Sequence, residues 1–253
     1  MSARYDCADT QQRESGILAA VAAVQQGGLV VLPTDTVYGI GADAFAPLAV
    51  TALLAAKGRG RNMPPPVLVG SVRAASALAE SLGAFGQDLI DEFWPGPLTL
   101  VFRAATTLKW DLGDTLGTVA VRMPLHPVAL ELLRKTGPMA VSSANRHGFA
   151  AATTAAEAEG QLGDSVSVYL DGGPCADHVP STIVDLTGTV PRMLRAGVVT
   201  IDQLRKVVPM IDLPAPPPEA GDGLPGGSGM AESQGPKPAE PHPLAGGDAG
   251  PGS

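Results

Sequence analysis

Apolar residues along this chain follow two patterns: short unbroken runs, and longer stretches with helical spacing. The short runs predict strands at 29–32, 67–69, 98–102, 118–122, 138–141, 165–170, 181–186 and 191–195. The longer stretches predict helices at 11–26, 47–56, 72–82, 85–93, 126–135, 154–161 and 200–208. Strands and helices that alternate in this way predict an α/β domain with helices around the sheet.

The stretch from residue 29 to residue 45 joins a strand to a cluster of polar side chains. Pro33 ends the apolar run because proline has no N–H for the sheet ladder. Three small polar residues follow it: Thr34, Asp35 and Thr36. The carboxyl ends of strands are where open α/β sheets bind ligands. Gly39 and Gly41 are then expected to allow tight turns and the close approach of a ligand. The plainer alternative for the three polar residues is a polar turn between two strands.

The chain changes character at Asp212. Proline and glycine supply 20 of the 42 residues from there to Ser253, without any aromatic residue or periodicity. Such a segment cannot bury enough apolar surface to offset its conformational entropy. We therefore predict a domain over residues 1–211 and a disordered, acidic, Pro/Gly-rich tail over residues 212–253.

Composition narrows the class of protein. Apolar residues make up 45% of the 253 positions, which is enough for a sizeable core. The two cysteines are too few for a disulfide framework and suggest a reducing compartment. The four histidines show no metal-ligand spacing with them, so we predict no metal site. The N-terminus lacks a signal core and the chain lacks an 18-residue apolar run, so we expect a cytoplasmic protein without membrane attachment.

The net charge of the chain argues against general nucleic-acid binding. The net charge is −8, and the segment from residue 212 onward holds six acids and one base. An acidic chain is poorly suited to binding nucleic acid through bulk charge. A local basic cleft remains open, and its candidate is the loop with Lys57, Arg59 and Arg61. The alternative is a solvated charged loop, which is the usual role of such runs.

Further polar clusters lie at or near the ends of predicted strands. They are Thr118 with Arg122, Ser143 with Asn145, Ser181 with Thr182, and Arg195. Guanidinium and ammonium groups beside hydroxyls and amides suit a phosphate or carboxylate ligand. The alternatives are a structural ion pair for Arg122 and a capping role for Ser143 and Asn145.

Several other kinds of site are not predicted. The chain has neither a Walker A loop nor a GxGxxG motif, and no Ser-His-Asp arrangement can be assembled. His147 is interpreted as a surface loop residue. Asp35 and Asp171 are the acids nearest to strand ends, and either could approach Mg²⁺ weakly. The residues alone therefore indicate an α/β domain with a basic, hydroxyl-rich cleft for a phosphorylated or adenylated ligand.

Seven motifs occur in a fixed order: PTDTVYGIGADAF, the KxR loop, WPGPLTLV, TVAVRMPLHP, SSAN, STIVD and LRAG. Together they resemble the YrdC/Sua5 family, the threonylcarbamoyl-AMP synthases. The resemblance covers roughly residues 10–200. It implies a twisted mixed sheet, surrounding helices and a large concave, positively charged cavity.

The resemblance also implies a reaction. L-threonine, bicarbonate (or CO2) and ATP form threonylcarbamoyl-AMP with release of pyrophosphate, which makes the chain a nucleotidyltransferase. Mg²⁺ accompanies the ATP, and no cofactor is permanently bound. The product serves the t6A modification of tRNA, and partner proteins carry out that transfer. Whether the domain itself contacts tRNA weakly is left open.

Individual residues match positions of the family motifs. Thr34, Arg122 and Ser181 match the threonine site, with Arg122 on the carboxylate. Lys57 and Arg59 match the KxR motif, which we expect to be catalytic and to face the ATP phosphates. The other matched ATP contacts are Thr118, Ser143, Asn145 and Arg195. Arg61 is added for its charge, although Gly60 replaces the proline that commonly follows the KxR motif. Longer members carry a second domain, so this chain resembles the short form.

Two other functions compete with this one. The first is a domain that holds RNA without chemistry, although a chain with few aromatics is poorly suited to stacking on bases. The second is a carbamoyl-adenylate enzyme of hydrogenase maturation. Such enzymes need acylphosphatase and zinc-finger modules, for which this chain has neither the room nor the cysteines.

Overall fold

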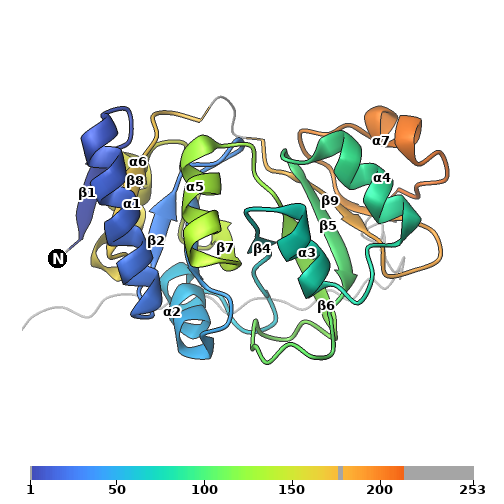
Figure 1. Ribbon diagram of the computed structural model, residues 1–253, viewed down its shortest axis with the longest axis horizontal. Coiled ribbons are helices and arrows are strands. Elements are labelled where there is room, and N and C mark those ends of the chain that lie inside the picture. Colours follow the sequence, from blue (N-terminus) through green and yellow to red (C-terminus); the bar gives the residue numbers. More distant parts are fainter. Residues whose placement is uncertain (1, 176–178, 214–253) are drawn as a thin grey trace, which may run out of the picture. The chain divides into compact units, whose positions relative to one another are not determined.

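The computed structural model describes residues 2–175 and 179–213, and these form one twisted sheet with helices around it (Figure 1). In sheet order the ten strands are β1 (Ala3–Asp6), β8 (Val168–Asp171), β2 (Val30–Leu32), β3 (Gly39–Asp43), β7 (Met139–Ser143), β4 (Val67–Leu68), β6 (Thr118–Arg122), β5 (Leu98–Arg103), β9 (Thr182–Asp185) and β10 (Arg192–Arg195). The helices are α1 (Thr10–Gln25), α2 (Pro47–Lys57), α3 (Val72–Leu78), α4 (Gly83–Phe93), α5 (Pro127–Thr136), α6 (Ala155–Leu162) and α7 (Ile201–Val207).

Strand pairing in this sheet is mixed. The pairs β1/β8, β2/β8, β4/β6 and β5/β9 are parallel. The pairs β2/β3, β3/β7, β4/β7, β5/β6 and β9/β10 are antiparallel. The predicted mixed α/β fold is therefore confirmed.

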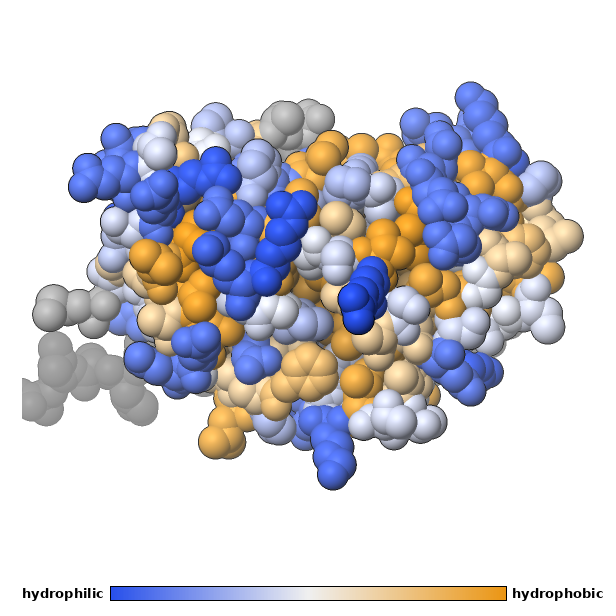
Figure 2. Space-filling view, viewed as in Figure 1, coloured by the Kyte–Doolittle hydropathy of each residue, from blue (hydrophilic) through white to orange (hydrophobic). Residues whose placement is uncertain are grey.

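The described helices pack against the sheet in three clusters, one of which contains α3, α4 and α7. Helix α1 packs beside α5, and buried side chains of both meet the strands β2, β7 and β8. Helices α2 and α6 pack their buried alanines and leucines against β2, β3 and β8 in a separate cluster. Figure 2 shows hydrophilic residues over α5 and α4, with hydrophobic surface in the gap between these helices.

Strand β6 shows how the sheet divides core from cavity. Its side chains alternate between the two faces, as strand geometry requires. Val119 and Val121 are buried in the core that α3 and α4 complete. Ala120 and Arg122 project from the opposite face and line a cavity. The same alternation places Thr99 and Val101 of β5 in that cavity, while Leu98, Leu100 and Phe102 belong to the core.

The expectation that Gly39 and Gly41 form turns is wrong. Both lie inside strand β3, which pairs with β2 on one side and β7 on the other. A Cβ atom on Gly39 would lie 2.6 Å from Cγ1 of Val141, and one on Gly41 would lie 2.9 Å from Cε of Met139. These glycines therefore allow close packing against β7 rather than a special backbone conformation.

The first strand of the described chain differs from the prediction. Strand β1 was not predicted, because its four residues alternate between half-buried and exposed and form no apolar run. At the other end, Ile211 is buried and Asp212 pairs with Arg192 in a single bridge. The division of the chain at residue 211 stays a prediction. The predicted tail lies, from residue 214 on, outside the described residues. Within the described chain, no helix is long and apolar enough to cross a membrane.

Two helical glycines give a matched test of this packing. A Cβ on Gly16 of α1 would lie 2.7 Å from Cβ of Tyr5, whereas one on Gly160 of α6 would meet no atom within 4 Å. We expect Gly16→Ala to lower the free energy of unfolding by about 1–3 kcal/mol through overpacking. Gly160→Ala should raise it by about 0.5–1 kcal/mol, because alanine is the better helix former. Urea unfolding measures the free energy of unfolding of both variants. Equal changes in the two variants would contradict the close packing of α1 against Tyr5.

Candidate functional site

A cavity of about 470 Å³ lies on the open face of strands β3 to β9. Six of the residues predicted to contact a ligand line it: Thr34, Arg59, Arg122, Ser143, Ser181 and Arg195. They come from segments up to 161 positions apart in sequence, between Thr34 and Arg195, and they meet because each lies in or next to a central strand. The sheet therefore gathers three guanidinium groups and several hydroxyls around one hollow.

Arg122 is the most deeply held of the three arginines, with 5% of its surface exposed. Its Nε donates to the Gly96 carbonyl at 3.0 Å, and its Nη1 donates to Thr36 Oγ1 at 3.0 Å. Its Nη2 donates to Asp35 Oδ1 at 2.6 Å, in an ion pair whose side chains are 6% and 11% exposed. The expected alternative of a structural ion pair is thus present, on a side chain that also faces the cavity.

The Arg122 guanidinium continues into a chain of hydroxyl groups. Thr34 Oγ1 donates its only proton to the Val37 carbonyl at 2.6 Å. The 3.1 Å contact between Thr34 Oγ1 and Thr36 Oγ1 is therefore donated by Thr36, which in turn accepts from Arg122. Thr34 Oγ1 also accepts from the Thr36 backbone N–H at 3.2 Å. The Thr34 hydroxyl is fully used and helps to orient the wall of the cavity.

Arg195 and Ser181 form a second polar wall. Arg195 donates to the Ser181 carbonyl from Nε and Nη2, and to Ser181 Oγ at 3.0 Å. Ser181 Oγ also meets Thr99 Oγ1 at 2.8 Å. A serine hydroxyl has three hydrogen-bonding positions, so one remains for a ligand. Nη1 of Arg195 has no acceptor among the described residues.

Arg59 is the least satisfied cation of the site. Its Nη1 donates to Ser142 Oγ at 3.1 Å, while its Nε is buried and has no partner in the described part of the chain. A buried donor without an acceptor costs roughly 1–3 kcal/mol. An anionic ligand that accepts from this group would recover that cost.

Electrostatics make the cavity suitable for anions. Burial lowers the pKa of Arg59 and of Arg122. Burial also lowers the pKa of Arg195, and the charges of Arg122 and Arg59 lower it further. Arg195 is thus close enough to the other two cations to be repelled by them. None of the described acidic residues lines the cavity, and only Arg122 has a carboxylate partner, so an anionic ligand would add the missing negative charge.

Lys57 differs from the prediction, since it ends helix α2 instead of lying in a mobile loop. It is 1% exposed and does not line the cavity. Its ammonium donates to the carbonyls of Ser143 and Asn145 and to Asn145 Oδ1, the last at 3.2 Å. Burial, and then the charge of Arg59, lower its pKa to about 7. Three acceptors match the three N–H groups of an ammonium, so Lys57 builds the turn that presents Ser143.

Asn145 completes that turn from the other side. Its Nδ2 donates to the carbonyls of Arg146 and Phe149 at 2.9 and 2.7 Å. Both amide donors are therefore used within the segment that follows β7, and Asn145 does not line the cavity. The prediction that Asn145 and Lys57 contact ATP remains a prediction, and in this structure both groups support the cavity wall.

Arg61 faces away from this cavity. It pairs with Asp111 at 2.8 and 2.9 Å, and its carbonyl accepts from the Asp114 N–H at 2.8 Å. These contacts dock the KxR loop on residues 104–117, where Phe45 stacks on Trp110. Thr118 shares the face of β6 with Arg122, but its hydroxyl donates to the Thr115 carbonyl at 2.8 Å and it lies outside the cavity lining. ATP contacts by Arg61 and Thr118 stay predictions.

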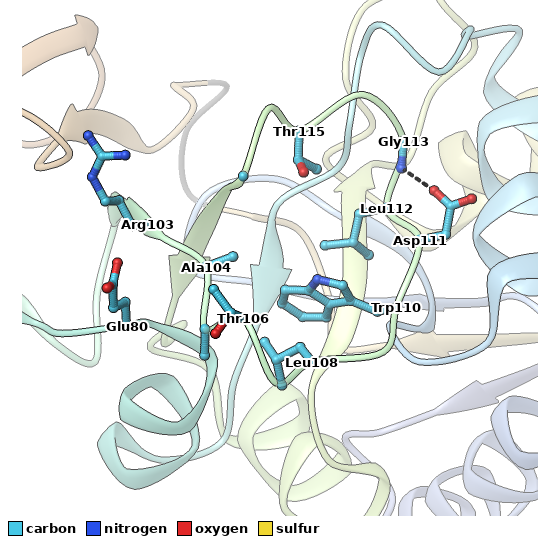
Figure 3. Close-up of a pocket in the computed structure, with 12 residues that line it drawn as sticks. Glu80, Arg103, Ala104, Thr106, Leu108, Trp110, Asp111, Leu112, Gly113 and Thr115 are labelled. Carbon is cyan, nitrogen blue, oxygen red and sulfur yellow. Dashed lines mark hydrogen bonds between the residues drawn. The ribbon is translucent and has the colours of Figure 1, made fainter.

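A second hollow, of about 410 Å³, lies beside residues 104–117 (Figure 3). Figure 3 shows Trp110 lying with Leu108 and Leu112, while Asp111 accepts from the Gly113 N–H at 3.1 Å. Only one arginine, Arg103, lines it, and that side chain is exposed. The 470 Å³ cavity has three arginines, of which Arg122 is buried and Arg59 is half-buried, and it is the better candidate site.

Sequence reasoning missed several cavity residues: Thr36 as an arginine anchor, Thr99, and Ser142. Alternation in the predicted strand at 98–102 would have placed Thr99 on the face opposite the core residues. Ser142 was predicted to follow a strand but lies within β7.

The two acids that could approach Mg²⁺ are both engaged in other contacts. Asp171 accepts from the Gly173 N–H at 3.1 Å, and Asp35 is paired with Arg122. Among the described residues, no three His, Cys, Asp or Glu side chains cluster as metal ligands.

The sequence of this chain is similar to known proteins of one family. The model of the Sua5/YciO/YrdC family, described as "Telomere recombination", matches residues 22–197. A Mycobacterium tuberculosis protein, provisionally named threonylcarbamoyl-AMP synthase, is 57% identical over 208 residues, which are 82% of this chain and 96% of that protein. Threonylcarbamoyl-AMP synthase of Pyrococcus abyssi is 36% identical over 193 residues, which are 76% of this chain and 57% of that protein.

Solved structures of Sua5 and YciO are similar to this fold. Sua5 of P. abyssi, complexed with L-threonine, superimposes with a TM-score of 0.78 at 32% identity. The match covers 84% of this chain and 62% of that one. YciO of Escherichia coli shares the fold, with a TM-score of 0.72 at 23% identity over 81% of this chain and all of that one.

The different burial of Lys57 and Arg59 leads to a prediction. Lys57→Met removes the donor for two backbone carbonyls and should lower the free energy of unfolding by about 2–4 kcal/mol. Arg59→Ala removes one hydrogen bond from a half-buried side chain and should change it by less than about 1 kcal/mol. Thermal unfolding of both variants checks this, and equal melting temperatures would show that Lys57 does not support the turn.

Proposed function

This chain belongs to the Sua5/YciO/YrdC family, and we propose that it is a threonylcarbamoyl-AMP synthase. The reaction joins L-threonine, bicarbonate (or CO2) and ATP and yields threonylcarbamoyl-AMP and pyrophosphate, with one water in addition when bicarbonate is the carbon source. The observation that carries this proposal is the cavity itself, in which three guanidinium groups with unused N–H donors surround hydroxyls without any described carboxylate in the lining.

Arg122 is suited to the threonine carboxylate. An arginine has five N–H groups, and protein acceptors use three of those on Arg122. The two that remain can bind a carboxylate through two parallel hydrogen bonds. Support comes from the similarity to a Sua5 structure that was solved with L-threonine. Ser181 Oγ, with one open position, is a second contact for the amino acid.

Arg59 and Arg195 are suited to the phosphates. The amine of threonine first adds to CO2 and loses a proton to solvent, which gives a carbamate, and a carbamate oxygen then attacks the α-phosphorus. A new O–P bond forms as the bond to the β-phosphate oxygen breaks and pyrophosphate leaves. Negative charge builds on the phosphate oxygens, where fixed cations with free N–H donors lower the barrier. Holding three reactants together supplies much of the remaining acceleration.

Mg²⁺ enters this scheme as part of the substrate MgATP. The described cavity lining offers arginines and hydroxyls rather than carboxylates, which fits a metal held by the phosphates themselves. Lys57, Ser143 and Asn145 act by shaping the segment that faces the nucleotide.

The product is the donor for the t6A modification of tRNA, and separate transfer proteins carry out that step. We place this activity in the cytoplasm, where ATP, threonine and tRNA are available. Direct contact of the domain with tRNA is not needed for the reaction.

Pyrophosphate release tests the proposed function. With MgATP, the chain should release pyrophosphate only when L-threonine and bicarbonate are both present. Arg59→Ala should reduce this rate by about 10²–10³-fold, because a phosphate-facing cation is lost. Arg103→Ala is the matched control, since this arginine is exposed and lies outside the cavity. Pyrophosphate release that does not depend on L-threonine would refute the proposal. So would the absence of pyrophosphate release from a folded chain.

A further inference from the structure

We propose that Asp35 is a positioning residue for the amino-acid substrate, acting through Arg122 without touching the substrate. This inference rests on the proposed function and adds a residue to its threonine site. Asp35 does not line the cavity, so its carboxylate lies behind the guanidinium that does.

One oxygen of Asp35 binds both the side chain of Arg122 and the backbone of the turn after β6. Oδ1 accepts from Arg122 Nη2 at 2.6 Å and from the Leu125 N–H at 2.9 Å. The first contact holds the guanidinium, and the second holds the turn that follows β6. Thr36 and Gly96 fix the other two nitrogens of Arg122 at 3.0 Å each. The orientation of the guanidinium plane is therefore set by three acceptors from two separate loops.

The three contacts of the Arg122 guanidinium determine which of its N–H groups stay free. One acceptor is used on each of Nε, Nη1 and Nη2, so the two free N–H groups lie on different terminal nitrogens. Two donors on one rigid plane match the two oxygens of a carboxylate. Without Asp35, Nη2 loses its anchor and the plane can rotate.

Hydrogen bonding alone does not explain a carboxylate at this position. Both contacts are made by Oδ1, and an asparagine oxygen could accept the same two bonds. Oδ2 is buried and has no hydrogen-bond partner in the described part of the chain, which carries a cost. What the aspartate adds is charge, and the neighbouring guanidinium is 5% exposed. The charge of Asp35 offsets the cost of burying that cation.

Charge compensation also affects selectivity. Arg59, Arg122 and Arg195 would together attract any small anion, including bicarbonate and phosphate. Asp35 cancels one of these charges at the place where the amino acid binds. Arg122 then binds a ligand mainly through the geometry of its two free donors, and bulk attraction remains at Arg59 and Arg195, where phosphates are expected.

Calorimetric binding of L-threonine to the full chain tests this inference. L-threoninamide, which lacks the carboxylate, is the matched ligand. Asp35→Ala should weaken L-threonine binding at least tenfold and leave threoninamide and ATP binding within about twofold. Glu131→Ala is the control variant, because it removes the partly exposed Arg13–Glu131 pair of α1 and α5, outside the cavity. Equal loss for both ligands, or no loss in a folded Asp35→Ala chain, would overturn the inference.

Asp35→Asn keeps the test decisive if Asp35→Ala does not fold. This variant retains an oxygen for both hydrogen bonds and removes only the charge. Inorganic phosphate should then compete with L-threonine at least tenfold more strongly than in the wild-type chain. Unchanged competition would refute the charge role. Failure of the proposed function is distinguishable, because the wild-type chain itself would then not bind L-threonine.

Discussion

Burial of positive charge is the constraint on which this site depends. Arg59, Arg122 and Arg195 line one cavity, where Arg122 is buried and Arg59 half-buried, and Lys57 is buried behind its wall. A buried cation costs several kcal/mol unless charges or hydrogen bonds compensate it. Arg122 has a carboxylate, Lys57 has three oxygens, and Arg195 has the Ser181 carbonyl. Arg59 keeps a buried Nε without a partner among the described residues, so it gains most from an anionic ligand.

The compensating groups come from segments next to strands, which ties the site to the register of the sheet. The loop after β2 supplies Asp35 and Thr36, the end of β7 supplies the carbonyls around Lys57, and the residue before β9 is Ser181. A slip of one residue in β6 would exchange its two faces and turn Arg122 into the core. The correct register therefore stabilises the fold and assembles the cavity at the same time.

The cavity also explains why a chain shorter than some relatives can carry the site. Every cavity residue that the mechanism uses, from Thr34 to Arg195, lies within the stretch that matches the family, residues 22–197. The chain spans 57% of the P. abyssi relative and 96% of the M. tuberculosis relative. The shared part contains the three arginines, the hydroxyl chain and the turn built by Lys57.

The sequence alone determined most of the elements, though not β1 or β3, together with the mixed α/β class and the family, because apolar periodicity and ordered motifs are local properties. It also pointed to six residues that line the cavity. Only the tertiary structure decided what each one contacts. Gly39 lies in a strand because β7 packs close to it, and Lys57 points into a turn 86 positions away. Asp35 lies behind Arg122 for the same reason: contacts between distant segments depend on how strands pair, and no local pattern records that pairing.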